Sequence, residues 1–205
     1  GSTGEPFFWP RDIWQEREVD SWYELIFRYL FDAHEKHTLV IIAFAMGMYI
    51  AGPFTYGSLL RIAQKGYPLT LVNSSNDIEA VIKILKSVGN QFDQIVLGGY
   101  PPLIRDILEQ VYESDITLPK TKLFFGGESF TETWRRHVYK LIKYSPGETS
   151  AINMYGTADS ALLAIETPSS ILFRDYASKN QNFRLEVFNN DRLPAVLSYN
   201  PLAKY

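Results

Sequence analysis

The feature that most constrains the fold is a regular alternation of short, continuous apolar runs with longer segments of helical periodicity. The apolar runs are rich in β-branched and aromatic side chains, as strands buried on both faces of a sheet are. They are residues 38–44, 69–73, 94–97, 122–125 and 151–155. Because the strands alternate with helices of about ten or more residues, the chain is predicted to form an α/β fold with a mostly parallel sheet and helices on both faces.

Capping residues and helix breakers predict where the helices begin and end. The first helix is expected to start at Asp20 or Ser21 and to run to about residue 34, and the second to open at Pro53. Ser75, Asn76 or Asp77 precedes a helix over residues 78–88, a further helix covers residues 102–112, and Thr131 caps the next. Each helix after the first is therefore expected to connect two consecutive strands.

The pattern changes after Gly156, where short strand-like runs are separated by Pro, Asn and Asp. These runs are residues 161–165, 171–173, 183–188 and 195–199. They predict a short antiparallel β appendage at the C-terminal end. We therefore divide the chain into an α/β region (1–160) and an incomplete, β-rich appendage (161–205) within one structural unit.

Composition excludes several classes of protein. With 46% hydrophobic residues and a net charge of −3, the chain is expected to be globular and to lack the basic surface that binds nucleic acid. The apolar run at residues 39–45 is too short to span a membrane. The sequence contains no cysteine and shows no secretion signal, which favours the cytoplasm. His34 and His37 lack the spacing of a zinc motif.

Loops at the carboxyl ends of the strands are the expected ligand-binding edge, as in other parallel α/β sheets. Gly126, Gly127 and Glu128 follow one strand, and taken alone they are most typical of a tight turn. Residues 154–159 follow the next strand and combine an aromatic ring, a glycine, a hydroxyl and a carboxylate. Such a set could stack a nucleotide base and hold Mg²⁺, or form an ordinary turn.

Taken together and in order, three loops resemble the motifs of adenylate-forming enzymes, the acyl-CoA synthetase superfamily. Residues 2–6 (STGEP) resemble the end of the phosphate loop. Residues 126–128 (GGE) resemble a G-G-E turn, and residues 155–159 (YGTAD) a Y-G-x-[ST]-E motif. Within that superfamily the chain is most similar to the phenylacetate-CoA ligase family, because residues 44–52 resemble its glycine-rich acyl-pocket segment. The resemblance covers residues 1 to about 168 and implies the N-terminal domain part of such an enzyme.

The resemblance implies that ATP and Mg²⁺ activate a carboxylic acid, possibly an aryl acid, to acyl-AMP, and that CoA then takes the acyl group. It assigns ATP contacts to Ser2, Thr3, Gly4, Gly126, Gly127, Glu128, Tyr155, Gly156 and Thr157, acid-pocket contacts to Gly47, Met48 and Tyr49, and Mg²⁺ to Asp159. No side chain is assigned as a nucleophile.

The resemblance also implies that the chain is a fragment that is inactive alone, because the family continues past Tyr205 to a domain with a catalytic lysine. Ala158 stands where the family has Ser or Thr, and Asp159 where it has Glu. A non-catalytic nucleotide-binding or scaffold domain derived from such a ligase therefore stays an alternative. An adenylating enzyme that uses a carrier-protein acceptor is another.

Overall fold

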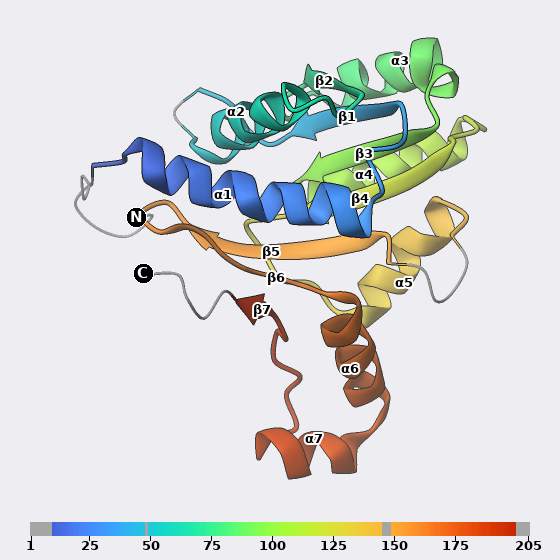
Figure 1. The fold of residues 1–205 in the computed structure, drawn as a ribbon. Coiled ribbons are helices and arrows are strands. Elements are labelled where there is room, and N and C mark those ends of the chain that lie inside the picture. Colours follow the sequence, from blue (N-terminus) through green and yellow to red (C-terminus); the bar gives the residue numbers. More distant parts are fainter. Residues whose placement is uncertain (1–9, 48, 145–148, 200–205) are drawn as a thin grey trace.

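The computed structural model describes residues 10–47, 49–144 and 149–199 (Figure 1). The helices are α1 (Ile13–Leu25), η1 (Ile26–Leu30, a π-helical turn), α2 (Ala51–Ala63), α3 (Ile78–Val88), η2 (Gly89–Gln91, a 3₁₀ turn), α4 (Pro101–Glu113), α5 (Glu132–Leu141), α6 (Pro168–Lys179) and α7 (Gln181–Phe188). The strands are β1 (Thr38–Ala43), β2 (Leu69–Asn73), β3 (Gln94–Gly99), β4 (Lys120–Phe125), β5 (Ala151–Thr157), β6 (Ala161–Ile165) and β7 (Ser198–Tyr199).

The strands form one seven-stranded sheet in the order β2-β1-β3-β4-β5-β6-β7. Strands β2, β1, β3, β4 and β5 are parallel, whereas β6 and β7 are antiparallel to their neighbours. This confirms the predicted α/β class with a mostly parallel sheet and antiparallel strands at its C-terminal end. From β1 the chain first adds β2 on one side and then crosses back to add β3 on the other side. The direction of the strand order therefore reverses at β1, and such a reversal opens a crevice at the carboxyl ends of the strands.

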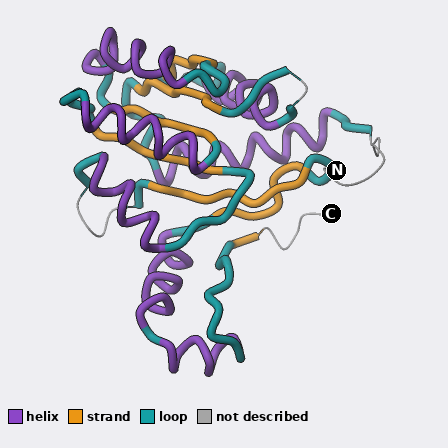
Figure 2. Tube along the Cα trace, turned by 180° about the vertical axis from the view of Figure 1, so that it is seen from behind, coloured by secondary structure: helices purple, strands orange, loops and turns teal. Residues whose placement is uncertain are grey.

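Helices cover both faces of the sheet and bury a separate core on each. Alternate residues of β1 belong to the two cores: Val40 and Ile42 pack with α1 and α2, and Leu39 and Ile41 with α3, α4 and α5. Figure 2, seen from behind, shows the second of these helix layers in front of the sheet. Within the described residues, no helix is both long and apolar enough to cross a membrane.

Two predicted helix starts are confirmed by hydrogen bonds. The carboxylate of Asp77 accepts from the backbone N–H of Ala80 at 2.9 Å, and the hydroxyl of Thr131 accepts from that of Trp134 at 3.2 Å. Each side chain satisfies a backbone donor that has no partner within the helix.

The predicted start of the first helix is wrong. The helix begins at Ile13, because the Asp12 carboxylate accepts from the backbone N–H groups of Trp14 and Gln15, both at 3.0 Å. Asp20 lies inside α1, where it is buried and receives a hydrogen bond from Nε of Arg61 on α2 at 2.7 Å. A carboxylate that resembles a cap in sequence is thus the acidic half of an ion pair between helices.

The strands predicted at residues 171–173 and 183–188 are also wrong, since these residues lie in α6 and α7. Thr167 and Ser170 form a reciprocal capping box at the start of α6, and Pro168 is the first residue of that helix. Asn180 caps α7. Short apolar runs do not distinguish a strand from a helix, and here the caps decide. The strand at residues 161–165 is confirmed as β6, whereas the one at 195–199 is reduced to β7.

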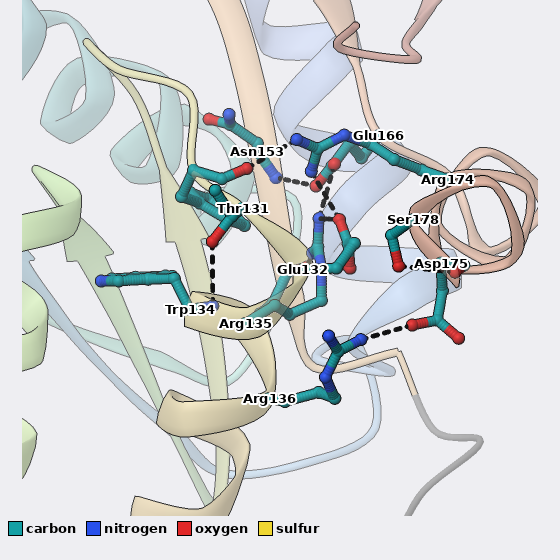
Figure 3. Close-up of polar contacts among 12 residues, drawn as sticks. Thr131, Glu132, Trp134, Arg135, Arg136, Asn153, Glu166, Arg174, Asp175 and Ser178 are labelled. Carbon is teal, nitrogen blue, oxygen red and sulfur yellow. Dashed lines mark hydrogen bonds and ion pairs between the residues drawn. The ribbon is translucent and has the colours of Figure 1, made fainter. Parts of the chain in front are cut away.

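A buried ionic network fastens α6 to the rest of the fold (Figure 3). Glu132 of α5 accepts hydrogen bonds from Arg135 of the same helix at 2.8 Å and from Arg174 of α6 at 2.5 Å. Arg135 also donates to Glu166, which follows β6, at 2.6 Å. The side chains are at most 7% exposed, and two arginines balance two glutamates, so the network carries no net charge.

Candidate functional site

A cavity of about 740 Å³ opens at the carboxyl ends of β1, β4 and β5. Its floor comes from the strand ends and the loops that follow them, and α1 and α2 supply one wall. The lining residues are Arg11, Val19, Tyr23, Ala43, Phe44, Ala45, Tyr49, Ile50, Ala51, Phe54, Thr55, Asn76, Tyr100, Leu103, Gly126, Gly127, Met154, Gly156, Thr157, Ala158, Ala161 and Leu162. The cavity therefore lies where the topology of the sheet places a ligand site.

Close packing below the cavity positions its apolar floor. A Cβ added to Gly98 of β3 would stand 1.9 Å from Cζ of Phe124, so only glycine leaves room for that ring beside the strand. The ring of Phe124 lies 6.0 Å from that of Phe44, measured between centroids, and Phe44 lines the cavity. Gly98 thus leaves room for the ring of Phe124, which packs against Phe44 in the lining of the cavity.

Two hydroxyls in the wall of the cavity satisfy each other. The phenol of Tyr23 and the hydroxyl of Thr55 lie 2.7 Å apart in a buried position. Burial raises the pKa of Tyr23 well above its ordinary value, and the hydrogen bond to Thr55 lowers it only in part. Tyr23 is therefore a neutral, largely apolar wall residue at physiological pH.

Of the described residues that line the cavity, Arg11 alone is charged. Its guanidinium lies over the ring of Phe54, 4.5 Å from the ring centroid, and its Nη2 donates a hydrogen bond to the carbonyl oxygen of Ala158. Residue 11 thereby connects α2 with the turn between β5 and β6.

The loop after β4 is shaped by its second glycine. Gly127 has a φ of +93°, which side chains with a Cβ rarely adopt, and an added Cβ would lie 3.3 Å from the Tyr100 ring. The Glu128 carboxylate beside the Tyr100 phenol raises the pKa of that phenol. The side-chain amide of Asn153 donates to the Glu128 carbonyl at 3.2 Å. These contacts hold the loop at the rim of the cavity.

The structure brings some of the predicted site residues together. Tyr49, Gly126, Gly127, Gly156 and Thr157 all line the cavity. Gly156 has a structural role as well, since a Cβ at this position would stand 2.2 Å from the carbonyl oxygen of Ala161 across the β5–β6 hairpin. The glycine-rich loops therefore meet at one edge of the sheet, as predicted.

Other predicted site residues do not line the cavity. Gly47 and Glu128 are close in sequence to residues that line the cavity but do not line it themselves. Tyr155 is 52% exposed and lies between the lining residues Met154 and Gly156 on β5. Ser2, Thr3, Gly4 and Met48 lie outside the described residues.

Asp159 lies at a neighbouring depression that Arg11, Asp12 and Glu18 also line. Its carboxylate accepts from the backbone N–H of Ser160 at 3.0 Å. A hydrogen bond from Thr157, together with backbone N–H groups, lowers the pKa of Asp159. Within the described residues there is no group of three or more His, Cys, Asp or Glu that could hold a metal ion. A Mg²⁺ site at Asp159 therefore stays a prediction.

Sequence reasoning missed much of the cavity wall. Arg11, Tyr23, Phe54 and Tyr100 belong to no motif, and their periodic or flanking positions indicate only ordinary packing. They become site residues because the helices place them beside the strand ends.

No protein-family model and no curated protein matches the sequence. Similar solved structures include CmiS6, with 20% identity, a TM-score of 0.44, and coverage of 70% of this chain and 33% of that one. The probable maltose operon transcriptional repressor malR from Staphylococcus aureus has 14% identity, a TM-score of 0.48, and coverage of 81% and 58%. The leucine binding protein LivK from Thermotoga maritima has 12% identity, a TM-score of 0.44, and coverage of 89% and 45%.

The chain thus spans between 33% and 58% of the length of these three structures. At such low identities the likeness extends to the α/β fold alone. It carries no argument about a ligand or a reaction.

These comparisons contradict the resemblance to adenylate-forming enzymes. No model of that superfamily matches, and the similar structures include a transcriptional repressor and an amino-acid binding protein. The predicted relation to phenylacetate-CoA ligase and the predicted ligase function are therefore wrong. The physical reason lies in the loops: Gly127 serves a turn with positive φ and Gly156 a tight hairpin, and α/β sheets of many functions need such glycines at this edge.

Binding of ATP, Mg²⁺, CoA or a small carboxylic acid stays a prediction, as do enzymatic activity, the lack of nucleic-acid or membrane partners, and a cytoplasmic location.

Proposed function

We propose that this domain binds a small molecule with an apolar body in the cavity at the carboxyl ends of β1, β4 and β5. The observation that carries the proposal is the cavity of about 740 Å³, which falls within the range of about 300–1,000 Å³ that is typical of ligand pockets.

The lining defines the chemistry of the body that fits. Aromatic and aliphatic side chains such as Phe44, Phe54 and Met154 dominate it, and the polar pair formed by Tyr23 and Thr55 is already satisfied internally. Burial of an apolar ligand surface here contributes roughly 25 cal/mol per Å². A ring or a branched aliphatic group therefore fits this cavity better than a sugar or a polar peptide.

Fluorescence titration with N-phenyl-1-naphthylamine, a neutral apolar probe, tests the proposal. The double variant Ala45→Phe/Ala51→Phe fills the cavity from the β1–α2 loop and the first turn of α2. Ala63→Phe/Ala80→Phe adds the same two rings on α2 and α3, outside the cavity lining. We expect the first variant to bind the probe at least tenfold more weakly, because its new rings occupy the space of the probe. The control should bind the probe like the wild type.

Equal binding by both variants would refute the proposal, because the probe would then sit elsewhere on the surface. A thermal-shift series provides a second measurement: a ligand at about 100 times its Kd stabilises the fold by about 2.7 kcal/mol. The filled variant should show no such shift. Titration with ATP and Mg²⁺ under the same conditions tests the remaining nucleotide prediction separately.

A further inference from the structure

We infer that the ligand of this cavity is an amphiphilic monoanion, and that Arg11 at the rim selects its negative group. The inference rests on the proposed binding function and adds the charge of the ligand to it. It starts from the composition of the lining, which, within residues 10–47, 49–144 and 149–199, contains one arginine and no Asp, Glu, Lys or His. The formal charge of the lining is therefore positive in a predominantly apolar setting, where an opposite charge is attracted more strongly than in water.

Among the described residues, no carboxylate forms an ion pair with the guanidinium of Arg11, although Asp12, Glu18 and Asp159 line the depression beside it. Across residues 10–47, 49–144 and 149–199, Arg11 takes part in no ion pair, whereas the arginines of the buried network and Arg61 all do. A guanidinium carries N–H donors on all three nitrogens, and among the described residues Nη2 alone donates, to the Ala158 carbonyl. The guanidinium thus retains donors for a further acceptor.

Arg11 is also held in place for such a contact. The ring of Phe54 lies under its guanidinium at 4.5 Å, and the Ala158 carbonyl, in the turn after β5, accepts a hydrogen bond from it. The side-chain amide of Gln15 on α1 donates to the carbonyl of Asp159 at 2.7 Å, which ties the same turn to the helix that follows Arg11. An arginine held in this way loses less conformational entropy when it binds an anion.

Nearby carboxylates limit the charge of the ligand. Asp12, Glu18 and Asp159 line the depression next to the cavity, and Arg11 lines both. The first negative charge of a ligand is paired with Arg11, which offsets its repulsion by these carboxylates. A second negative charge has no such partner and is repelled more strongly. The arrangement therefore favours a carboxylate or sulfonate over a phosphate dianion.

Two fluorescent probes that differ in one group test the inference. 8-Anilinonaphthalene-1-sulfonate and N-phenyl-1-naphthylamine share the same body, but only the first carries a sulfonate. Arg11→Met keeps the apolar stem and removes the charge, and Arg11→Lys keeps the charge. Arg17→Met is the matched control, because Arg17 also lies over an aromatic ring, that of Trp14 at 5.2 Å, but does not line the cavity.

We expect Arg11→Met to weaken sulfonate binding about tenfold, the loss typical of one charge-assisted hydrogen bond at a partly exposed site. Binding of the neutral probe should change less than about twofold, Arg11→Lys should restore part of the sulfonate affinity, and Arg17→Met should change neither. In displacement of the neutral probe, 2-naphthoate and 2-naphthalenesulfonate should compete better than 2-naphthyl phosphate at about pH 8, where the phosphate is a dianion.

Equal losses for both probes in Arg11→Met would overturn the inference, since Arg11 would then only shape the cavity. Unchanged sulfonate binding, or stronger competition by the phosphate, would overturn it too. In each of these cases the wild type still binds the neutral probe in the cavity, and the proposed function stands. If filling the cavity does not affect the neutral probe, the proposed function itself fails.

Discussion

Replacement of Arg135 by methionine is expected to destabilise the fold by about 3–5 kcal/mol, the cost of breaking a buried ion pair by removing one partner. The side chain of Arg135 is 2% exposed, and its Nε and Nη2 donate to Glu132 and Glu166 at 2.8 and 2.6 Å. Without it, the Glu166 carboxylate keeps the backbone N–H of Asn153, at 2.8 Å, but loses its cation. The cost comes from a buried charge left without a counterion.

The adjacent residue provides a matched control. Arg136 pairs with Asp175 of α6 at 2.8 Å, but these side chains are 45% and 34% exposed, so water screens the pair. Arg136→Met should therefore cost less than about 1 kcal/mol. In a chain of this size, each kcal/mol of lost stability lowers the Tm by roughly 2–4 °C. The Tm should therefore fall by about 6–20 °C for Arg135→Met and by about 4 °C at most for Arg136→Met.

The loss should depend on pH with a defined sign. Burial raises the pKa of Glu166, and Arg135 opposes this shift, so the pKa rises further when Arg135 is removed. A carboxyl with a raised pKa contributes stability that is present below its unfolded pKa and is lost as the pH rises through the folded pKa. The variant should therefore lose more stability at about pH 7 than at about pH 5.

Urea denaturation followed by circular dichroism measures these differences as midpoints at a common m-value. Arg135→Met/Glu166→Gln removes both charges of the pair and keeps an acceptor for Asn153, so it should recover at least about 1 kcal/mol relative to Arg135→Met. The reasoning is refuted if Arg135→Met and Arg136→Met cost the same, or if the loss does not vary with pH.

Three further predictions use the same denaturation assay. Gly156→Ala should cost about 1–3 kcal/mol, because the new Cβ would meet the Ala161 carbonyl oxygen at 2.2 Å; a neutral result would show that the hairpin can open. Burial raises the pKa of Tyr23, so its contribution is present below about pH 10, its ordinary unfolded pKa, and is lost as the pH rises toward the folded value. In Tyr23→Phe the urea midpoint should depend less on pH between about pH 9 and 11 than in the wild type. The same pH dependence in both proteins would contradict the contribution assigned to Tyr23. Asp77→Ala should cost about 0.5–2 kcal/mol through loss of the cap on the Ala80 N–H, and no loss would mean that the cap is replaced.

The C-terminal region shows where pattern reasoning stops. Residues 171–173 are a run of three apolar residues, and residues 183–188 alternate apolar residues with Arg184 and Glu186. Neither pattern by itself separates a strand from a helix. The helices form because Thr167, Ser170 and Asn180 satisfy their first N–H groups and because Arg174 reaches the buried network. Such long-range support for a local structure is not visible in the run itself.

The candidate site divides in the same way. Gly126, Gly127 and Gly156 could be found from sequence, because glycine pairs and tight turns after buried strands indicate a ligand edge. Their interpretation as motifs of one enzyme superfamily was wrong, since the same residues are required by a positive φ and by a hairpin contact. A glycine motif therefore located the edge of the sheet without identifying its chemistry.

The sequence by itself determined the alternation of strands and helices, and with it the parallel sheet and the edge where the cavity lies. It could do so because burial on both faces, helical periodicity and capping each depend on residues that are close in the chain. The tertiary structure alone decided which side chains meet at that edge. Arg11 and Ala158 are 147 positions apart, and their contact exists because α1 packs on α2 and against β6 next to the end of β5. The charge at the rim of the cavity is therefore a property of packing between distant elements, which no local pattern encodes.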